Sequence, residues 1–101
     1  MLELIAYFFA GCLLVNGVPH FVQGVSGHYF QSPFARPPGI GESSPQVNVL
    51  WGAFNFIAGT LLLCHVGSFV AGYNAGTTAL VVGGIAMAYV LAGHFGKVRN
   101  N

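Results

Sequence analysis

The sequence predicts an all-α membrane protein with three transmembrane helices, and three observations carry this prediction. The chain is 54% hydrophobic and only 5% charged, whereas a soluble domain usually has about 25% charged residues. Its apolar residues form three long runs that polar or Pro/Gly-rich stretches separate. The runs show no alternation of polar and apolar residues, so strands of a membrane β-barrel are excluded. We therefore expect residues 1–101 to form a single transmembrane domain.

The three predicted spans cover about residues 2–22, 47–66 and 73–95. Each run is long enough to cross a hydrocarbon core about 30 Å thick. Ser44 is a favourable N-cap and Pro45 suits the first helical position, so the second span should begin there. Gly67 and Gly72 permit a turn between the second and third spans. The short connection predicts that these two spans form an antiparallel hairpin.

The few charges predict an orientation in the membrane. Three spans place the 23–46 loop and the C-terminal tail on the same side. All the basic side chains lie there, namely Arg36, Lys97 and Arg99. The positive-inside rule makes this side cytoplasmic, so the N-terminus is expected outside and the C-terminus inside.

The 23–46 loop is rich in proline and glycine. Prolines stiffen a chain and glycines let it turn, so we expect an ordered, extended cover over the helix ends rather than a flexible linker. Arg36 and Glu42 are expected to pair across this loop.

Small residues in the third span predict close helix packing. Small side chains at every fourth position let helix backbones approach closely where lipid gives no hydrophobic drive. Two such rows indicate two neighbours, of which one belongs to the same chain and the other to a second copy or a partner. This pattern predicts a homo-oligomer or a larger membrane complex. The rows are Gly84, Ala88, Ala92 and Gly96, and beside them Ala75, Ala79 and Gly83.

Polar residues inside the spans form the candidate site. Counted at about 1.5 Å per residue, they all fall in the cytoplasmic half, at one level beneath the loop. Their side chains can form hydrogen bonds between the helices. They can instead form a pocket for a lipid headgroup, a quinone or a small solute, with Arg36 and Glu42 in its lid. The residues are Asn16, His20, Asn48, Asn55 and His94.

A third alternative is a haem with His20 and His94 as axial ligands, as in membrane b-type cytochromes. The chain has no HxxxH or CxxC spacing, so no metal site is expected.

Catalysis by this chain is not expected. Its only carboxylates, Glu3 and Glu42, are predicted on opposite sides of the membrane, so they cannot act as an acid/base pair. Three basic residues are too few for a nucleic-acid interface. The favoured interpretation is a non-catalytic, self-assembling or accessory subunit without a resident cofactor. A binder or conduit for a lipid, quinone or solute, and a haem redox protein, are the alternatives.

The run "NGVPHFVQGVSGHYFQSPFARPPGIGESSPQVNVLWG", residues 16–52, resembles a group of small bacterial integral membrane proteins with no established activity. The shared features are a Gly-x-Pro-His-Phe stretch, a Pro-Phe-Ala-x-Pro-Pro-Gly loop and a Ser-Ser-Pro-x-x-Asn-Val-Leu-Trp-Gly helix start. The resemblance covers about a third of the chain and implies a bacterial inner membrane. A more remote similarity is to DoxX-like membrane proteins, which have four helices, whereas this sequence predicts three.

Overall fold

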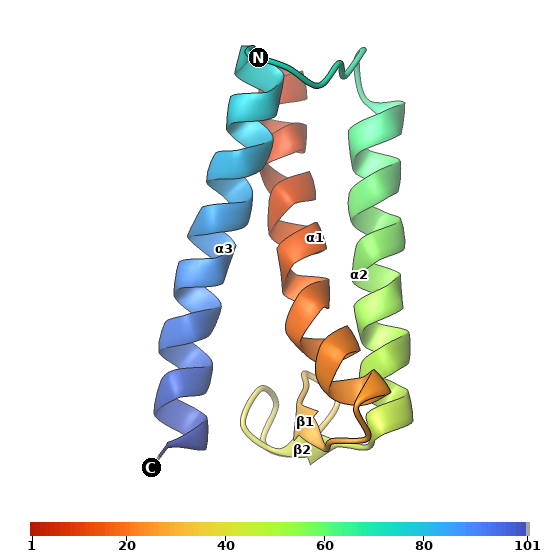
Figure 1. Ribbon diagram of the computed structural model, residues 1–101, viewed down its shortest axis with the longest axis vertical. Helices are drawn as coiled ribbons and strands as arrows, with labels where there is room; N and C mark the ends of the chain where they lie inside the picture. Colours follow the sequence, from red (N-terminus) through yellow and green to blue (C-terminus); the bar gives the residue numbers. More distant parts are fainter. Residues whose placement is uncertain (101) are drawn as a thin grey trace.

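The computed structural model describes residues 1–100 and consists of three long helices joined by two connections (Figure 1). All three helices are long and apolar enough to cross a membrane, which confirms the predicted helical membrane protein. Between α1 and α2 the chain forms one short antiparallel strand pair, which the all-α prediction did not include. The elements are α1 (Leu2–Val25), β1 (Phe30–Gln31), β2 (Glu42–Ser43), α2 (Pro45–His65) and α3 (Ala75–Arg99).

The helix starts have local causes. The Ser44 hydroxyl accepts a hydrogen bond from the Val47 N–H at 3.2 Å, and Pro45 is the first residue of α2. This confirms the predicted start of that helix. α3 begins two residues later than predicted, because Asn74 is its N-cap and accepts from the Thr77 N–H at 2.8 Å.

Helix α1 is the centre of the molecule, since α2 and α3 each pack along α1 and make almost no contact with each other (Figure 1). The second and third spans run antiparallel, but they do not pack against each other as the two arms of a tight hairpin would. The nine residues 66–74 are long enough to carry the chain past α1. Tyr7 of α1 holds this connection, because its hydroxyl donates to the Val66 carbonyl at 2.7 Å and its ring packs edge-on against Phe69.

The contact between α1 and α2 runs along buried small residues at seven-residue spacing. Gly17 of α1 faces Gly52 of α2, Gly24 of α1 lies against Val49, and Gly59 of α2 lies against Leu14. A Cβ atom added to Gly17 would lie 2.8 Å from the Gly52 carbonyl oxygen, which no real packing tolerates. The two backbones therefore touch, as small residues allow in membranes.

The contact between α1 and α3 is equally close, but it uses only part of the predicted rows. Gly83 and Gly84 are buried, and a Cβ on Gly83 would overlap the Phe8 carbonyl of α1. The Cys12 thiol donates to the Gly83 carbonyl at 3.4 Å. Below this point α3 diverges from α1, and the rest of the row is exposed: Ala88, Ala92 and Gly96.

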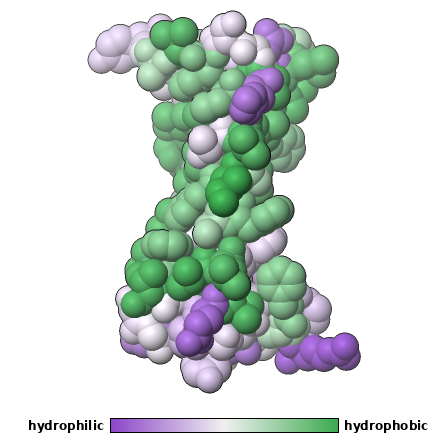
Figure 2. All heavy atoms as spheres, turned by 90° about the vertical axis from the view of Figure 1, so that its right-hand side faces the viewer, coloured by the Kyte–Doolittle hydropathy of each residue, from purple (hydrophilic) through white to green (hydrophobic). Residues whose placement is uncertain are grey.

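Apolar side chains cover the middle of the molecule on the side that α2 presents, and the hydrophilic residues gather toward the two ends (Figure 2). Polar side chains are costly in hydrocarbon. This distribution is the one expected of a protein that spans a bilayer. We call the end that carries β1, β2 and residues 26–44 the loop end.

We predict that Gly83→Ala destabilises the helix bundle. The new methyl group would overlap the Phe8 backbone, and overpacking of this kind costs ~1–3 kcal/mol. The matched control is Gly93→Ala, because a Cβ at Gly93 meets nothing within 4 Å. Reversible unfolding in detergent measures both free energies. The control should lose no stability, since alanine favours a helix over glycine by up to ~1 kcal/mol. Equal stability of the two variants would contradict the α1–α3 contact.

Candidate functional site

Asn48 joins four segments of the chain at the loop end. Its side chain is 0% exposed. The side-chain nitrogen donates to the carbonyls of Phe30, Ser43 and Ser44 at 3.1, 3.2 and 3.2 Å. The side-chain oxygen lies 2.9 Å from Nδ1 of His20. One amide thus ties α1, both strands and the start of α2 together.

This arrangement determines which nitrogen of His20 carries the proton. The three carbonyls accept only, so the Asn48 atom that faces them must be the NH₂ group. The oxygen of Asn48 then faces His20, and Nδ1 of His20 must donate to it. Nε2 of the neutral imidazole is therefore the acceptor nitrogen. The ring is 3% exposed and lies edge-on to the rings of Phe30, Trp51 and Phe95.

A second polar pair lies one turn farther from the loop. Asn16 donates to the side-chain oxygen of Asn55 at 3.0 Å, and Asn55 donates to the Trp51 carbonyl at 2.8 Å. Asn55 is 1% exposed. Asn16, His20, Asn48 and Asn55 therefore bond to one another across α1 and α2. Such bonds hold membrane helices together and leave no open polar pocket.

His94 lies apart from this group, on the exposed side of α3. Its Nε2 is 2.6 Å from the Gly39 carbonyl of the loop. At the end of the same helix, Arg99 donates to the side chain of Gln31 at 2.9 Å and lies 4.8 Å above the Phe30 ring. The loop thereby fills the space where α3 diverges from α1. It also lies over the buried amide of Asn48, which is bonded to the Phe30 carbonyl.

The expected pair of Arg36 and Glu42 does not form. Glu42 pairs instead with Arg99 at 3.3 Å, and Arg36 makes no ion pair within residues 1–100. The strand register is the cause, because it sets Glu42 opposite Gln31, next to the end of α3. Position 41 folds back onto the Arg36 backbone, and only a glycine fits there.

The residues do not fit a haem between His20 and His94. His94 directs its Nε2 at a loop carbonyl, and His20 is held by Asn48. The Phe95 ring packs against both imidazoles, at 6.1 Å from His20 and 5.2 Å from His94. Within residues 1–100, no group of three His, Cys, Asp or Glu side chains could hold a metal ion.

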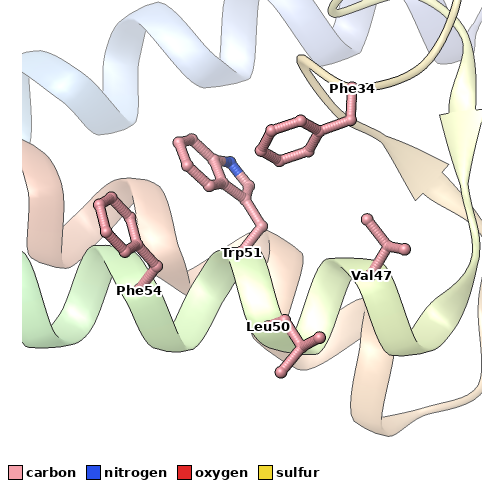
Figure 3. Close-up of a pocket in the computed structure, with 5 residues that line it drawn as sticks. All are labelled: Phe34, Val47, Leu50, Trp51 and Phe54. Atoms are coloured by element: carbon pink, nitrogen blue, oxygen red, sulfur yellow. The ribbon is translucent and has the colours of Figure 1, made fainter.

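Beside the polar residues lies an apolar groove of about 560 Å³ on the outer side of α2 and the loop (Figure 3). Trp51 stacks on Phe54 at 5.7 Å and meets Phe34 edge-on at 5.1 Å. The indole N–H of Trp51 is buried and has no hydrogen-bond partner within residues 1–100. The groove is lined by Phe34, Val47, Leu50, Trp51 and Phe54.

The sequence analysis did not single out Trp51 or Arg99 as site residues. A signal for Trp51 exists, since it lies three residues after Asn48 and four before Asn55 and so shares their side of the helix. No comparable signal exists for Arg99, because its partners depend on how far α3 diverges from α1.

Comparisons with protein-family models, with curated proteins and with solved structures gave no match to the chain. The resemblance of residues 16–52 to small bacterial membrane proteins stays a prediction.

We predict that Asn48→Ala loosens the loop. The change removes the hydrogen bonds from α2 to the Phe30 and Ser43 carbonyls and leaves the His20 N–H without its partner, and an unsatisfied buried group costs ~1–3 kcal/mol. Hydrogen exchange followed by mass spectrometry should show amides of residues 30–43 exchanging about 10- to 100-fold faster. Asn55→Ala is the control, because it removes a buried asparagine of the same helix that does not touch the loop. Unchanged exchange in Asn48→Ala would show that the amide does not hold the loop.

Proposed function

We propose that this protein is a non-catalytic, self-assembling subunit of the bacterial inner membrane, with its N-terminus outside and its loop end in the cytoplasm. One observation carries the proposal: the outer face of α3 has small residues, and no part of residues 1–100 covers it. Ala88, Ala92 and Gly96 are exposed, and a Cβ at Gly96 would meet nothing within 4 Å.

Elsewhere in α3, small residues already form a close contact between helices. Gly83 and Gly84 lie against α1, where the helices touch through their backbones. Of an apolar 18-residue stretch in each helix, 11% is buried inside the protein in α3 and 28% in α1. Without a hydrophobic drive in lipid, small residues favour association because they let the backbone of another helix approach closely. The exposed face of α3 thus favours a helix from a second copy.

The polar residues support a structural subunit over a catalytic one. Asn16 bonds to Asn55, Nδ1 of His20 bonds to Asn48, and both Asn48 and Asn55 donate to backbone carbonyls within the fold. The orientation is supported by Arg36, Lys97 and Arg99, which all lie at the loop end.

We predict that Ala92→Leu disrupts self-assembly. A leucine there fills the groove between helices, and the loss of close packing should weaken association about tenfold or more. Native mass spectrometry from mild detergent, together with cross-linking in membranes, measures the stoichiometry. Thr60→Leu is the control, because Thr60 is exposed on α2 and the change introduces a leucine away from α3. Gly84→Leu is unsuitable, because Gly84 packs against Val15 of α1.

A wild-type protein that is monomeric in the membrane would contradict the proposal. So would an Ala92→Leu variant that assembles as tightly as the wild type.

A further inference from the structure

The indole N–H of Trp51 is a buried donor without an acceptor in the described chain. Buried polar groups in proteins nearly always have a hydrogen-bond partner, so each exception needs an explanation. In hydrocarbon the need is stronger, because no water replaces the missing acceptor. Neither Asn55 nor His20 accepts a hydrogen bond from it, although both side chains lie near the indole.

The unpaired N–H belongs to the ring that forms the wall of the apolar groove. Figure 3 shows the indole nitrogen on the side of the ring that faces Phe34. Phe34 is 62% exposed and packs on the indole only edge-on, so its ring can turn aside and uncover the N–H. The remaining groove residues, Val47, Leu50 and Phe54, offer only hydrocarbon.

The depth of the groove matches the ester region of a phospholipid. Trp51 lies six residues after Pro45, the first residue of α2. At about 1.5 Å per residue this is roughly 9 Å below the helix start. Tryptophan is enriched at this level of membrane proteins, where an N–H can meet a lipid carbonyl.

A free positive charge lies at the end of the same surface. Residues 33–38 line a second hollow, which includes Arg36 and shares Phe34 with the groove. Arg36 is exposed and makes no ion pair within residues 1–100, because Glu42 pairs with Arg99. A guanidinium binds phosphate well, since its N–H groups match two oxygens at once.

We propose that this surface binds one anionic phospholipid. Its phosphate pairs with Arg36, an ester carbonyl accepts from the Trp51 N–H, and an acyl chain lies along Val47, Leu50 and Phe54. The three features have the same order as the parts of a phospholipid. The Arg36 charge lies at the loop end, the Trp51 N–H lies deeper in the membrane, and the apolar residues of the groove take the acyl chain. The site does not depend on self-assembly, because it lies on α2 and the loop and the assembly face lies on α3.

Fluorescence tests the proposal directly, because Trp51 is the only tryptophan of the chain. The protein is reconstituted into phosphatidylcholine vesicles that contain a minor share of phospholipid with dibrominated acyl chains, which quench tryptophan on contact. The brominated lipid is either phosphatidylglycerol or phosphatidylcholine. We expect phosphatidylglycerol to occupy the groove about fivefold more tightly than phosphatidylcholine. Arg36→Gln should remove this preference, and the control Lys97→Gln, an exposed cation at the same end, should keep it.

Three results would overturn the proposal. Equal quenching by both lipids would mean that the groove holds bulk lipid of any headgroup. Equal loss of preference in Arg36→Gln and Lys97→Gln would mean that diffuse positive charge attracts the lipid. No quenching by either lipid would mean that protein, such as a second copy, covers the groove.

Native mass spectrometry from nanodiscs with the same two lipids tests the role of the N–H. The wild type should retain one phosphatidylglycerol, and Trp51→Phe, which keeps an aromatic ring, should retain it about fivefold less often. Retention equal to the wild type would show that the N–H does not contact the lipid. Circular dichroism checks that the variant keeps its helices.

Discussion

The hydrogen bonds of Asn48 are the interaction on which the rest of the structure depends. A single buried NH₂ group shares its two hydrogens among three backbone carbonyls, and the amide oxygen orients His20, so that Asn48 joins α1, the strand pair and the start of α2. Polar bonds of this kind are strong constraints in a membrane, because a broken bond leaves groups that water cannot satisfy. The position of the loop follows from this amide. The position of the loop in turn determines what α3 can contact at the same end.

The fold combines two ways of holding helices together. Away from the loop, glycines let α2 and α3 touch the backbone of α1. At the loop end α3 diverges, and His94 and Arg99 reach the loop instead of another helix. The loop thus replaces a helix contact. This division leaves two surfaces of different chemistry, a small-residue face on α3 and an aromatic groove on α2, which the two proposals assign to a second copy and to a lipid.

Much of this architecture follows from sequence patterns, and the remainder depends on distances that patterns do not encode. The three helices follow from hydropathy, and the Ser44 cap follows from the Ser-Pro helix start. The partner of Glu42 does not, because it depends on a two-residue strand register inside a proline-rich loop. The central place of α1 was also missed, since its glycines recur at intervals of six and seven rather than four.

The tautomer of His20 tests the central claim most directly. Nitrogen-15 NMR of the histidine-labelled protein in a bilayer, with His20 assigned by comparison with His20→Gln, distinguishes protonated from unprotonated ring nitrogens. If the Asn48 amide donates to the three carbonyls, Nδ1 of His20 must carry a proton, so the neutral ring has its proton on Nδ1 and an unprotonated Nε2. A His20 ring that carries its proton on Nε2, or that exchanges rapidly between both forms, would contradict the account, because Asn48 would then not be fixed by the loop.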